Sequence, residues 1–480
     1  MSAFTIVLEW LIIVALFQGV KPLPPGVNYE GNSYPASDSN LQFLADLTYL
    51  DNNDSLIQQQ EIFDTLFACI TSAREYILLD MFLINSFKGP SGWSYRDLSP
   101  ELTRLLVKKK QDIPNIQIDV ITDPVNIFYG GSQSLELESL KQAGVNVIIT
   151  NLPRLRDSTP LYSPIWRTGF RWMGNTDRFG IVPQMFSAEA DPVTVRSYLA
   201  FLNLKANHRK VFIADKNGQM ISMVISANPH SASSDFSNIG ILVKGDLARD
   251  LWYTEKQLAR FSGTDLQVEI PHLSNSTPEM SLTGNRIKLI TEGMIKEELL
   301  DQFSQAGKGD TIKMAMFYLS NRKIMSGLLQ AADNGAVVRM ILDPNKDGFG
   351  FRRNGVPNRP AAHELTRKSQ GRIDIRWYHT HGEQFHSKLT MVKRADGTAT
   401  LILGSANLTR KNLNNFNLET NICLDLVPGS GTGTEVDNYF DSLWYNRGAM
   451  LTKEYAYFAD RGILKTLQYR IQEFSGLSTY

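Results

Sequence analysis

The amino-acid sequence contains an internal duplication, which constrains the fold more than any other feature. The segment REYILLDMFLINSF at residues 74–87 resembles GDTIKMAMFYLSNR at residues 309–322. Each reads as a buried strand that ends in a polar loop, and a helical pattern follows each of them. The apolar strands IQIDVITDP at 116–124 and AVVRMILDP at 336–344 then both stop at Asp-Pro. The same order of strands and helices therefore occurs twice.

The second half of each copy adds a distinctive pair of segments. A His-x-Lys segment occurs at 207–215 (NHRKVFIAD) and again at 385–393 (FHSKLTMVK). A strand ending in Ser-Ala-Asn follows each, at 223–228 and 401–407, and one more strand comes after it. Strands that alternate with helices are typical of an α/β protein with mainly parallel sheets covered by helices.

The N-terminal segment FTIVLEWLIIVALFQGV at residues 4–20 is almost entirely apolar, with Glu9 as its one charge. Its length is close to the roughly 20 residues that span a bilayer as a helix. Three interpretations remain open: an uncleaved anchor, which we favour, a cleaved signal peptide, or a buried helix. An N-terminal anchor by default exports the rest of the chain. We therefore expect a membrane-associated protein with a single N-terminal segment and an extracytoplasmic catalytic part.

Each His-x-Lys segment supplies residue types that could form half of a catalytic site. Side chains alternate along a strand, so His208 and Lys210 share a face, and a hairpin can bring Asn228 beside that lysine. The second copy repeats this arrangement with His386, Lys388 and Asn407.

Two such half-sites that face each other can cleave a phosphodiester. Lysine and asparagine donors can hold the non-bridging oxygens of a phosphoryl group. One histidine can attack the phosphorus while the other protonates the departing oxygen, and the two imidazoles titrate as a coupled pair. The duplication thus predicts phosphodiester cleavage through a covalent intermediate.

The paired segments resemble the HxKxxxxD signatures of the phospholipase D superfamily, and the resemblance spans roughly residues 40–460. It implies an α/β fold of two duplicated α/β/α lobes, with mostly parallel sheets packed face to face and an N-terminal hydrophobic helix in front. It also implies a site at the lobe interface without a metal or organic cofactor. By motif position, the resemblance implies that His208 is the nucleophile and His386 the general acid.

The sequence departs from the family signature at two places. The signature aspartate is Asp215 in the first copy, a position that is mainly structural in the family, and Lys393 replaces it in the second. The family also uses a downstream acidic residue to orient the partner histidine. Glu419 matches it in the second copy, whereas the first copy has SNIGI there, with Asn238 and Gly240. We therefore expect the other histidine to find a different support, for which Asp235 is the candidate.

We divide the chain into an anchor or signal segment (1–22), a first phospholipase D-like lobe (23–270) and a second (271–480). The first lobe carries an insert at about 152–192, rich in aromatic and arginine residues. This insert is either a helical embellishment of the surface or a cap over the site that contacts substrate or membrane. Because both half-sites lie in one chain, we expect a monomer.

The substrate is less determined than the chemistry. The chain has 49 basic and 49 acidic residues, so we expect no nucleic-acid partner. With the N-terminal segment, this favours a phospholipid substrate, hydrolysed to phosphatidic acid or transferred to an alcohol as in cardiolipin synthases. The alternatives are a nuclease of the same fold and a catalytically inactive lipid-binding module.

Other motifs carry less weight. The two cysteines, Cys69 and Cys423, lie in apolar runs, so we expect two buried unpaired thiols and no zinc site built on cysteine. The segment HTHGEQFH offers His379 and His381 as metal ligands, yet the first copy has no counterpart, so we predict no metal. The loop DGFGFRRNG at 347–355 lacks a nucleotide-binding signature, and we expect its arginines, Arg352 and Arg353, near the anionic headgroup.

Overall fold

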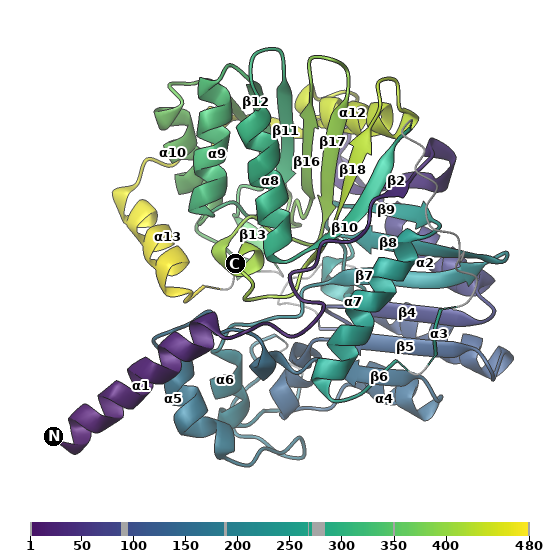
Figure 1. The fold of residues 1–480 in the computed structure, drawn as a ribbon, viewed down its shortest axis with the longest axis vertical. Helices are drawn as coiled ribbons and strands as arrows, with labels where there is room; N and C mark the ends of the chain where they lie inside the picture. Colours follow the sequence, from purple (N-terminus) through teal and green to yellow (C-terminus); the bar gives the residue numbers. More distant parts are fainter. Residues whose placement is uncertain are drawn as a thin grey trace.

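Two large sheets, one for each copy of the duplication, form the framework of the molecule (Figure 1). The computed structural model describes residues 2–87, 95–186, 190–266, 268–270, 284–348 and 351–478. The second lobe lies above the first in the view of Figure 1, and their sheets face each other. The predicted α/β fold of two lobes packed face to face is confirmed.

The first sheet has the strand order β3-β2-β9-β8-β7-β4-β5-β6. Its strands are β2 (Leu41–Leu50), β3 (Leu56–Gln59), β4 (Tyr76–Met81), β5 (Gln117–Thr122), β6 (Asn146–Ile149), β7 (Lys210–Lys216), β8 (Gln219–Ile225) and β9 (Asn238–Lys244). Its helices are α2 (Glu61–Ser72), α3 (Leu98–Asp112), α4 (Leu135–Gln142) and α7 (Leu247–Ser262). Helices α2, α3 and α4 share one core with the outer face of the sheet, and α7 belongs to the core between the lobes.

The second sheet repeats this plan, with the order β1-β10-β18-β17-β16-β11-β12-β15-β19. Its strands are β1 (Tyr34–Pro35), β10 (Arg286–Thr291), β11 (Thr311–Met316), β12 (Val337–Leu342), β15 (Ile373–Tyr378), β16 (Lys388–Lys393), β17 (Ala399–Gly404), β18 (Thr420–Leu426) and β19 (Thr452–Glu454). Its helices are α8 (Gly293–Gln305), α9 (Arg322–Asp333), α10 (Asn358–Lys368), α11 (Arg410–Leu413), α12 (Gly431–Trp444) and α13 (Ile463–Ser475). A small hairpin of β13 (Asp347–Gly348) and β14 (Phe351–Arg352) stands apart from this sheet.

The expectation of mostly parallel sheets is wrong. Among the described strand pairs, those that run parallel are joined through helices. They are β4-β5-β6 in the first sheet and β11-β12-β15 in the second. The His-x-Lys strands β7 and β16 and the strands that follow them are joined without a long crossover, so they pair antiparallel. Strands β2 and β10, which come before the recognised repeat, also pair antiparallel, with β9 and β18.

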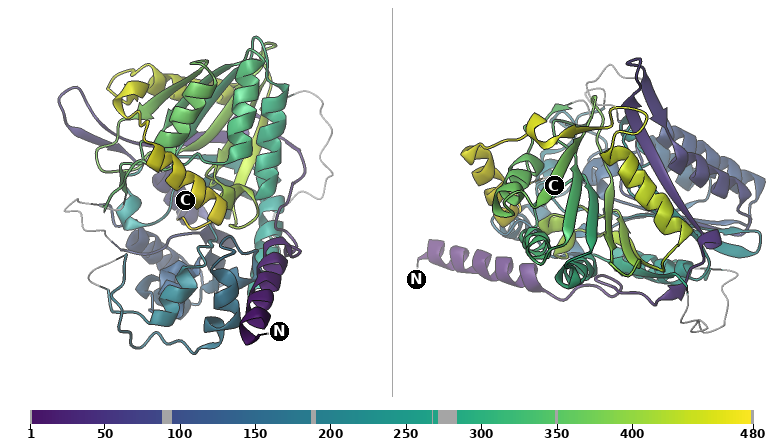
Figure 2. Two further views of the ribbon diagram at one scale, coloured as in Figure 1. Left: turned by 90° about the vertical axis from the view of Figure 1, so that its left-hand side faces the viewer. Right: turned by 90° about the horizontal axis from the view of Figure 1, so that it is seen from above.

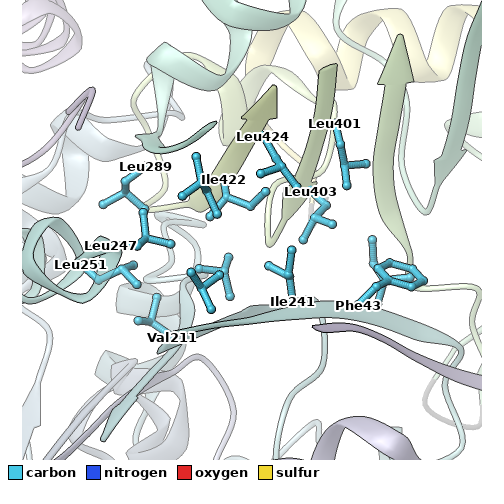
Figure 3. Packing of buried hydrophobic residues seen from close by; sticks show 14 of the residues in the cluster. Phe43, Val211, Ile241, Leu247, Leu251, Leu289, Leu401, Leu403, Ile422 and Leu424 are labelled. Carbon is cyan, nitrogen blue, oxygen red and sulfur yellow. The ribbon is translucent and has the colours of Figure 1, made fainter. Parts of the chain in front are cut away.

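The inner faces of the two sheets pack against each other through branched aliphatic side chains (Figure 3). Val211 and Ile241 come from the first sheet, and Leu403 and Ile422 from the second. All four are buried, so their apolar surface is removed from water only when the lobes are together. The core thus fixes the position of one lobe on the other, which the site requires.

The N-terminal segment forms the helix α1 (Ala3–Val20), and none of its residues is buried. The buried-helix interpretation is therefore wrong. Among the described residues, α1 is the helix long and apolar enough to cross a membrane, which fits an anchor or a signal sequence alike. Figure 1 shows α1 beside the insert helix α5 (Ser163–Thr168), where Nε1 of Trp10 donates to Oγ1 of Thr168 at 3.2 Å.

The insert lies below α13 in Figure 1 and is built from α5 and short turns, and the helix α6 (Val195–Phe201) follows it. Residues 187–189 of the insert, and residues 271–283 at the expected lobe boundary, lie outside the described part. Strand β1 falls in the range expected for the first lobe, yet it pairs with β10 of the second sheet. The cysteines Cys69 and Cys423 are buried and unpaired, as expected.

Candidate active site

The two histidine segments meet at the junction of the lobes and are tied there by backbone hydrogen bonds. The backbone N–H of His208 donates to the carbonyl of Leu418 at 2.9 Å, in the opposite lobe. The N–H of His386 donates to the carbonyl of Ser237 at 2.8 Å, which is the mirror contact. Each histidine is therefore positioned by the segment that enters the last repeated strand of the other lobe, β18 or β9.

Glu419 supports the first imidazole. Nδ1 of His208 lies 3.0 Å from the Glu419 carboxylate, which is itself fully buried. Oγ of Ser405 donates to the same carboxylate at 2.5 Å, and Nδ2 of Asn412 donates to its other oxygen. With Nδ1 held by a carboxylate, Nε2 of His208 is the nitrogen left for a ligand.

Asn238 supports the second imidazole in the same way. Nδ1 of His386 lies 3.0 Å from Oδ1 of Asn238, which also accepts a hydrogen bond from Oγ of Ser226 at 3.1 Å. The pairing of β8 with β9 and of β17 with β18 places Asn238 at the position of Glu419. The expectation that Asp235 takes this role is wrong, because the amide at the matching position accepts the bond instead.

The two lysines are held alike. Nζ of Lys210 donates to the carbonyl of His208 at 2.7 Å, and Nζ of Lys388 donates to the carbonyl of His386 at 2.7 Å. Each ammonium also lies over an aromatic ring, Phe82 at 5.2 Å and Phe317 at 5.1 Å. An ammonium has three N–H donors, so each lysine keeps donors for an anion.

The two asparagines bring amide groups to the same place. Asn228 and Asn407 line one cavity together with His208 and His386. Within the described part of the chain, the side-chain oxygens of both asparagines are buried without a hydrogen-bond partner. Buried polar atoms without partners are uncommon, and a donor group of a ligand in the cavity would give these two oxygens a partner.

Two aspartates fix the backbone directly before the histidines. Neither was among the predicted site residues. Oδ2 of Asp123 accepts a hydrogen bond from the N–H of Asn207 at 2.7 Å, directly before His208. Oδ2 of Asp343 accepts one from the N–H of Phe385 at 2.7 Å, directly before the other histidine. These are the aspartates of the two Asp-Pro strand ends, so the repeated dipeptide was the signal that could have identified them.

Asp215 is not brought together with the other predicted residues. It lies near the opposite end of β7 from His208, and its carboxylate accepts hydrogen bonds from three backbone N–H groups, those of Arg74, Glu75 and Tyr76, at 2.8–3.1 Å. Its role in the structure is to hold the start of β4. The matching Lys393 forms an ion pair with Asp437 at 2.6 Å.

Burial dominates the electrostatics of the site. It lowers the pKa of His208 to about 4, although Glu419 opposes the shift. Burial, with Lys388 next, holds the pKa of His386 well below its ordinary value, and burial lowers the pKa of Lys210 to about 7. Burial thus opposes the positive charge of these basic groups, and an anion bound among them would stabilise their protonated forms.

The cavity lined by the two histidines and the two asparagines has a volume of about 610 Å³. Aromatic side chains make up much of its wall: Phe82, Phe87, Tyr129, Phe186, Phe201, Phe236, Phe317, Tyr318 and Phe351. Leu83, Met185 and Leu204 add further apolar surface. The cavity is thus polar at the histidines and apolar around them.

The remaining predictions have mixed outcomes. Arg353 lines the cavity and donates to the hydroxyl of Tyr318, whereas Arg352 is exposed. Residues 349–350 of that loop lie outside the described part. The rings of His379 and His381 lie 4.4 Å apart, and the described residues hold no group of three side chains suited to a metal ion.

One family model and one solved structure of similar fold match this chain. Residues 299–444 match the family described as cardiolipin synthase, phospholipase D-like domain. The fold is similar to the crystal structure of phosphatidylserine synthase from Haemophilus influenzae Rd KW20, with a TM-score of 0.57 and 11% identity over 94% of this chain and 96% of that one. A search of curated protein sequences found no significant match.

Two further solved structures are similar over smaller shares. Polyphosphate kinase from Porphyromonas gingivalis has a TM-score of 0.45 and 12% identity, over 84% of this chain and 47% of its own. A phospholipase D family member from Salmonella typhimurium has a TM-score of 0.28 and 17% identity, over 35% of this chain and 97% of its own.

Proposed function

Because the chain belongs to the phospholipase D superfamily, we propose that it cleaves the phosphodiester bond of a phospholipid through a phosphohistidine on His208. The observation that carries this proposal is the convergence of His208 and His386, one from each lobe, on one cavity. That cavity offers paired nitrogen donors and an apolar wall, the two features that a phospholipid headgroup region needs.

The phosphate would lie between the two half-sites. We expect Lys210 and Lys388 to donate to its non-bridging oxygens, together with the amides of Asn228 and Asn407. These donors are fixed before substrate arrives, since each lysine is already held by the carbonyl of its own histidine. Pre-positioned positive charge in a buried site stabilises the negative charge that grows on the phosphoryl oxygens in the transition state.

The unequal supports assign unequal roles to the histidines. When Nε2 of His208 bonds to phosphorus, the ring becomes cationic, and the Glu419 carboxylate 3.0 Å away stabilises that charge. His386 is backed by the neutral amide of Asn238, which does less to stabilise its cation and leaves the protonated ring the stronger acid. In this step the bond from phosphorus to the headgroup oxygen breaks, and His386 gives that oxygen its proton.

The second step reverses the first. Water, or an alcohol, attacks the phosphorus while His386 takes its proton, and the bond from phosphorus to Nε2 of His208 breaks. Water gives phosphatidic acid and an alcohol gives a new phosphodiester, so hydrolysis and transfer differ only in the attacking hydroxyl.

We also propose that the chain acts as a monomer held at the membrane by α1, with the catalytic part on the extracytoplasmic side. The lobe division at residue 270 belongs to this proposal. Support comes from the presence of both half-sites in one chain and from the exposure of every described residue of α1 to some degree.

A substrate panel tests the function. The full chain in detergent micelles is offered labelled phosphatidylglycerol, phosphatidylcholine and single-stranded DNA, with and without added alcohols. We expect phosphatidic acid, or the phosphatidyl-alcohol, from the lipids only. The variants His208→Ala and His386→Ala should lose activity by about 10³-fold or more, whereas His363→Ala on α10 serves as the matched control and keeps it. Cleavage of DNA with inert lipids would contradict the proposal.

A further inference from the structure

Helix α13 presents its apolar side away from the protein. Its exposed apolar residues share one face: Ile463, Leu464, Leu467, Ile471 and Phe474. At about 100° per residue these positions fall within an arc of about 100°. Tyr469 and Glu473 lie on the opposite, buried side. A surface helix of a soluble protein normally turns its apolar stripe toward the core, and α13 does the reverse.

The insert adds a second exposed apolar group next to α13. Its exposed side chains include Leu161, Ile165, Trp172, Met173, Phe179 and Ile181. The guanidinium of Arg171 lies 5.2 Å from the ring of Trp172, a pairing that suits the headgroup level of a bilayer. Exposed apolar residues gathered in this way mark an interaction surface.

Both groups lie on the side of the molecule that carries α1. Figure 1 shows α13, α5 and α1 along one side, and the left view of Figure 2 faces that side, with α13 across the middle and α1 and the insert below it. Hydrogen bonds from Trp10 to Thr168 and from Lys21 to the carbonyl of Pro153 join α1 to the insert. We call the exposed apolar residues of α13 and the insert the docking face.

The charges of the docking face fit an anionic surface. The exposed arginines in and next to these segments are Arg154, Arg171, Arg178, Arg461 and Arg470, of which Arg470 also pairs with Glu364 at 2.9 Å. The carboxylate within α13, Glu473, is buried and accepts a hydrogen bond from Ser320 at 2.6 Å. In the described part of the insert, the exposed carboxylates are Asp177 and Asp191. Arginines around an apolar patch bind anionic lipid headgroups.

The catalytic cavity reaches the surface at this face. Met185 of the insert is exposed and also lines the cavity. Phe186, Phe201 and Leu204 line the same cavity. Ser478, which comes after α13, lines the cavity as well, and its carbonyl accepts from Nζ of Lys411. The segments that form the docking face therefore also form one wall of the site.

We propose that α13 and the insert dock on an anionic phospholipid bilayer, so that the cavity opens onto the membrane surface beside α1. Two features of the face identify the occupant as a bilayer. It is continuous with the one described helix suited to cross a membrane, and it combines apolar side chains with arginine. The passage of substrate from the bilayer into the cavity rests on the proposed function, whereas docking does not.

Fluorescent labelling at single introduced cysteines tests the docking. Phe474→Cys and Phe179→Cys are each labelled with a polarity-sensitive dye on the full chain, since the native cysteines are buried. Leu16→Cys on α1 reports membrane attachment, and Val337→Cys lies at the N-terminal end of β12, away from the site. The carriers are phosphatidylcholine vesicles with and without phosphatidylglycerol, with lipid-borne quenchers.

We expect quenching at positions 16, 474 and 179, stronger with phosphatidylglycerol, and none at 337. Quenching at position 16 alone would overturn the proposal, and so would quenching at none of them. The exposed double substitution Leu464→Glu with Phe474→Glu should lower turnover of vesicle lipid by about tenfold or more. It should leave turnover of a soluble short-chain phospholipid unchanged. If the wild-type chain did not turn over the short-chain phospholipid, the proposed function would be contradicted. Docking would still be tested separately by the quenching measurements.

Discussion

Glu419 of the second lobe holds Nδ1 of His208 of the first lobe at 3.0 Å. The neutral variant Glu419→Gln keeps the shape of the support and removes its charge, so the proposed cationic phosphohistidine would lose its stabilisation. We expect kcat to fall by about 10²–10⁴-fold with the fold retained. Steady-state kinetics and thermal unfolding measure both quantities. Asp425→Asn on β18, the strand that begins directly after Glu419, lies outside the site and is the matched control. Full activity in Glu419→Gln would exclude the assigned role.

Asn238→Asp makes the second support resemble the first. A carboxylate beside His386 stabilises its protonated form, and so raises its pKa. A general acid works only while protonated, and activity is lost as pH rises through its pKa. The alkaline limb of the kcat profile should therefore move to higher pH in the variant. The profile of kcat against pH on a soluble substrate measures this, and an unmoved limb would show that His386 is not the acid.

Asp215→Asn tests whether the signature aspartate is structural. Its carboxylate bonds three backbone N–H groups at the start of β4, and the site lies at the other end of β7. We expect the free energy of unfolding to fall by about 1–3 kcal/mol, with kcat of the folded variant unchanged. Urea unfolding and kinetics at low temperature provide the two readings. Lost activity at unchanged stability would assign Asp215 to the chemistry instead.

Asp123 gives the stability of the protein a pH dependence. Burial raises the pKa of this carboxyl to about 7, from an ordinary value of 3.8. The folded state therefore binds the proton more tightly than the unfolded state. The stability that this carboxyl contributes is fully present below about pH 4 and is lost as pH rises through about 7. Asp123→Asn should flatten the free energy of unfolding between these pH values, as measured by urea unfolding. An unchanged slope would contradict this reading.

The half-sites could be predicted from the sequence because two short-range rules determine them. Alternation along a strand places His208 and Lys210 together, and the hairpin of β7 and β8 returns the chain to Asn228. The duplication then supplies the second set. The duplication could also have identified Asp123 and Asp343, because they follow matching strands in the two copies.

Other parts of the fold could not be predicted in this way. Strands buried on both faces are apolar throughout, so their composition does not reveal whether neighbours run parallel or antiparallel, and β2 and β10 carry no repeated motif. Asn238 was not predicted as a support because the family pattern has an acidic residue at this position. Its amide oxygen can nevertheless accept the hydrogen bond from the histidine. The outward apolar stripe of α13 becomes meaningful only when the structure shows which side is buried.

Mapping the covalent intermediate shows whether His208 is the nucleophile. A short-chain phosphatidyl ester with a p-nitrophenol leaving group does not need the general acid, so the first step is expected to proceed in the wild-type chain and in His386→Ala. Rapid quenching at alkaline pH followed by mass spectrometry of peptides locates the phosphoryl group. We expect the adduct on His208, and we expect it to accumulate in His386→Ala because the second step lacks its base. An adduct on His386 of the wild-type chain, or turnover with no adduct on either histidine, would contradict this expectation.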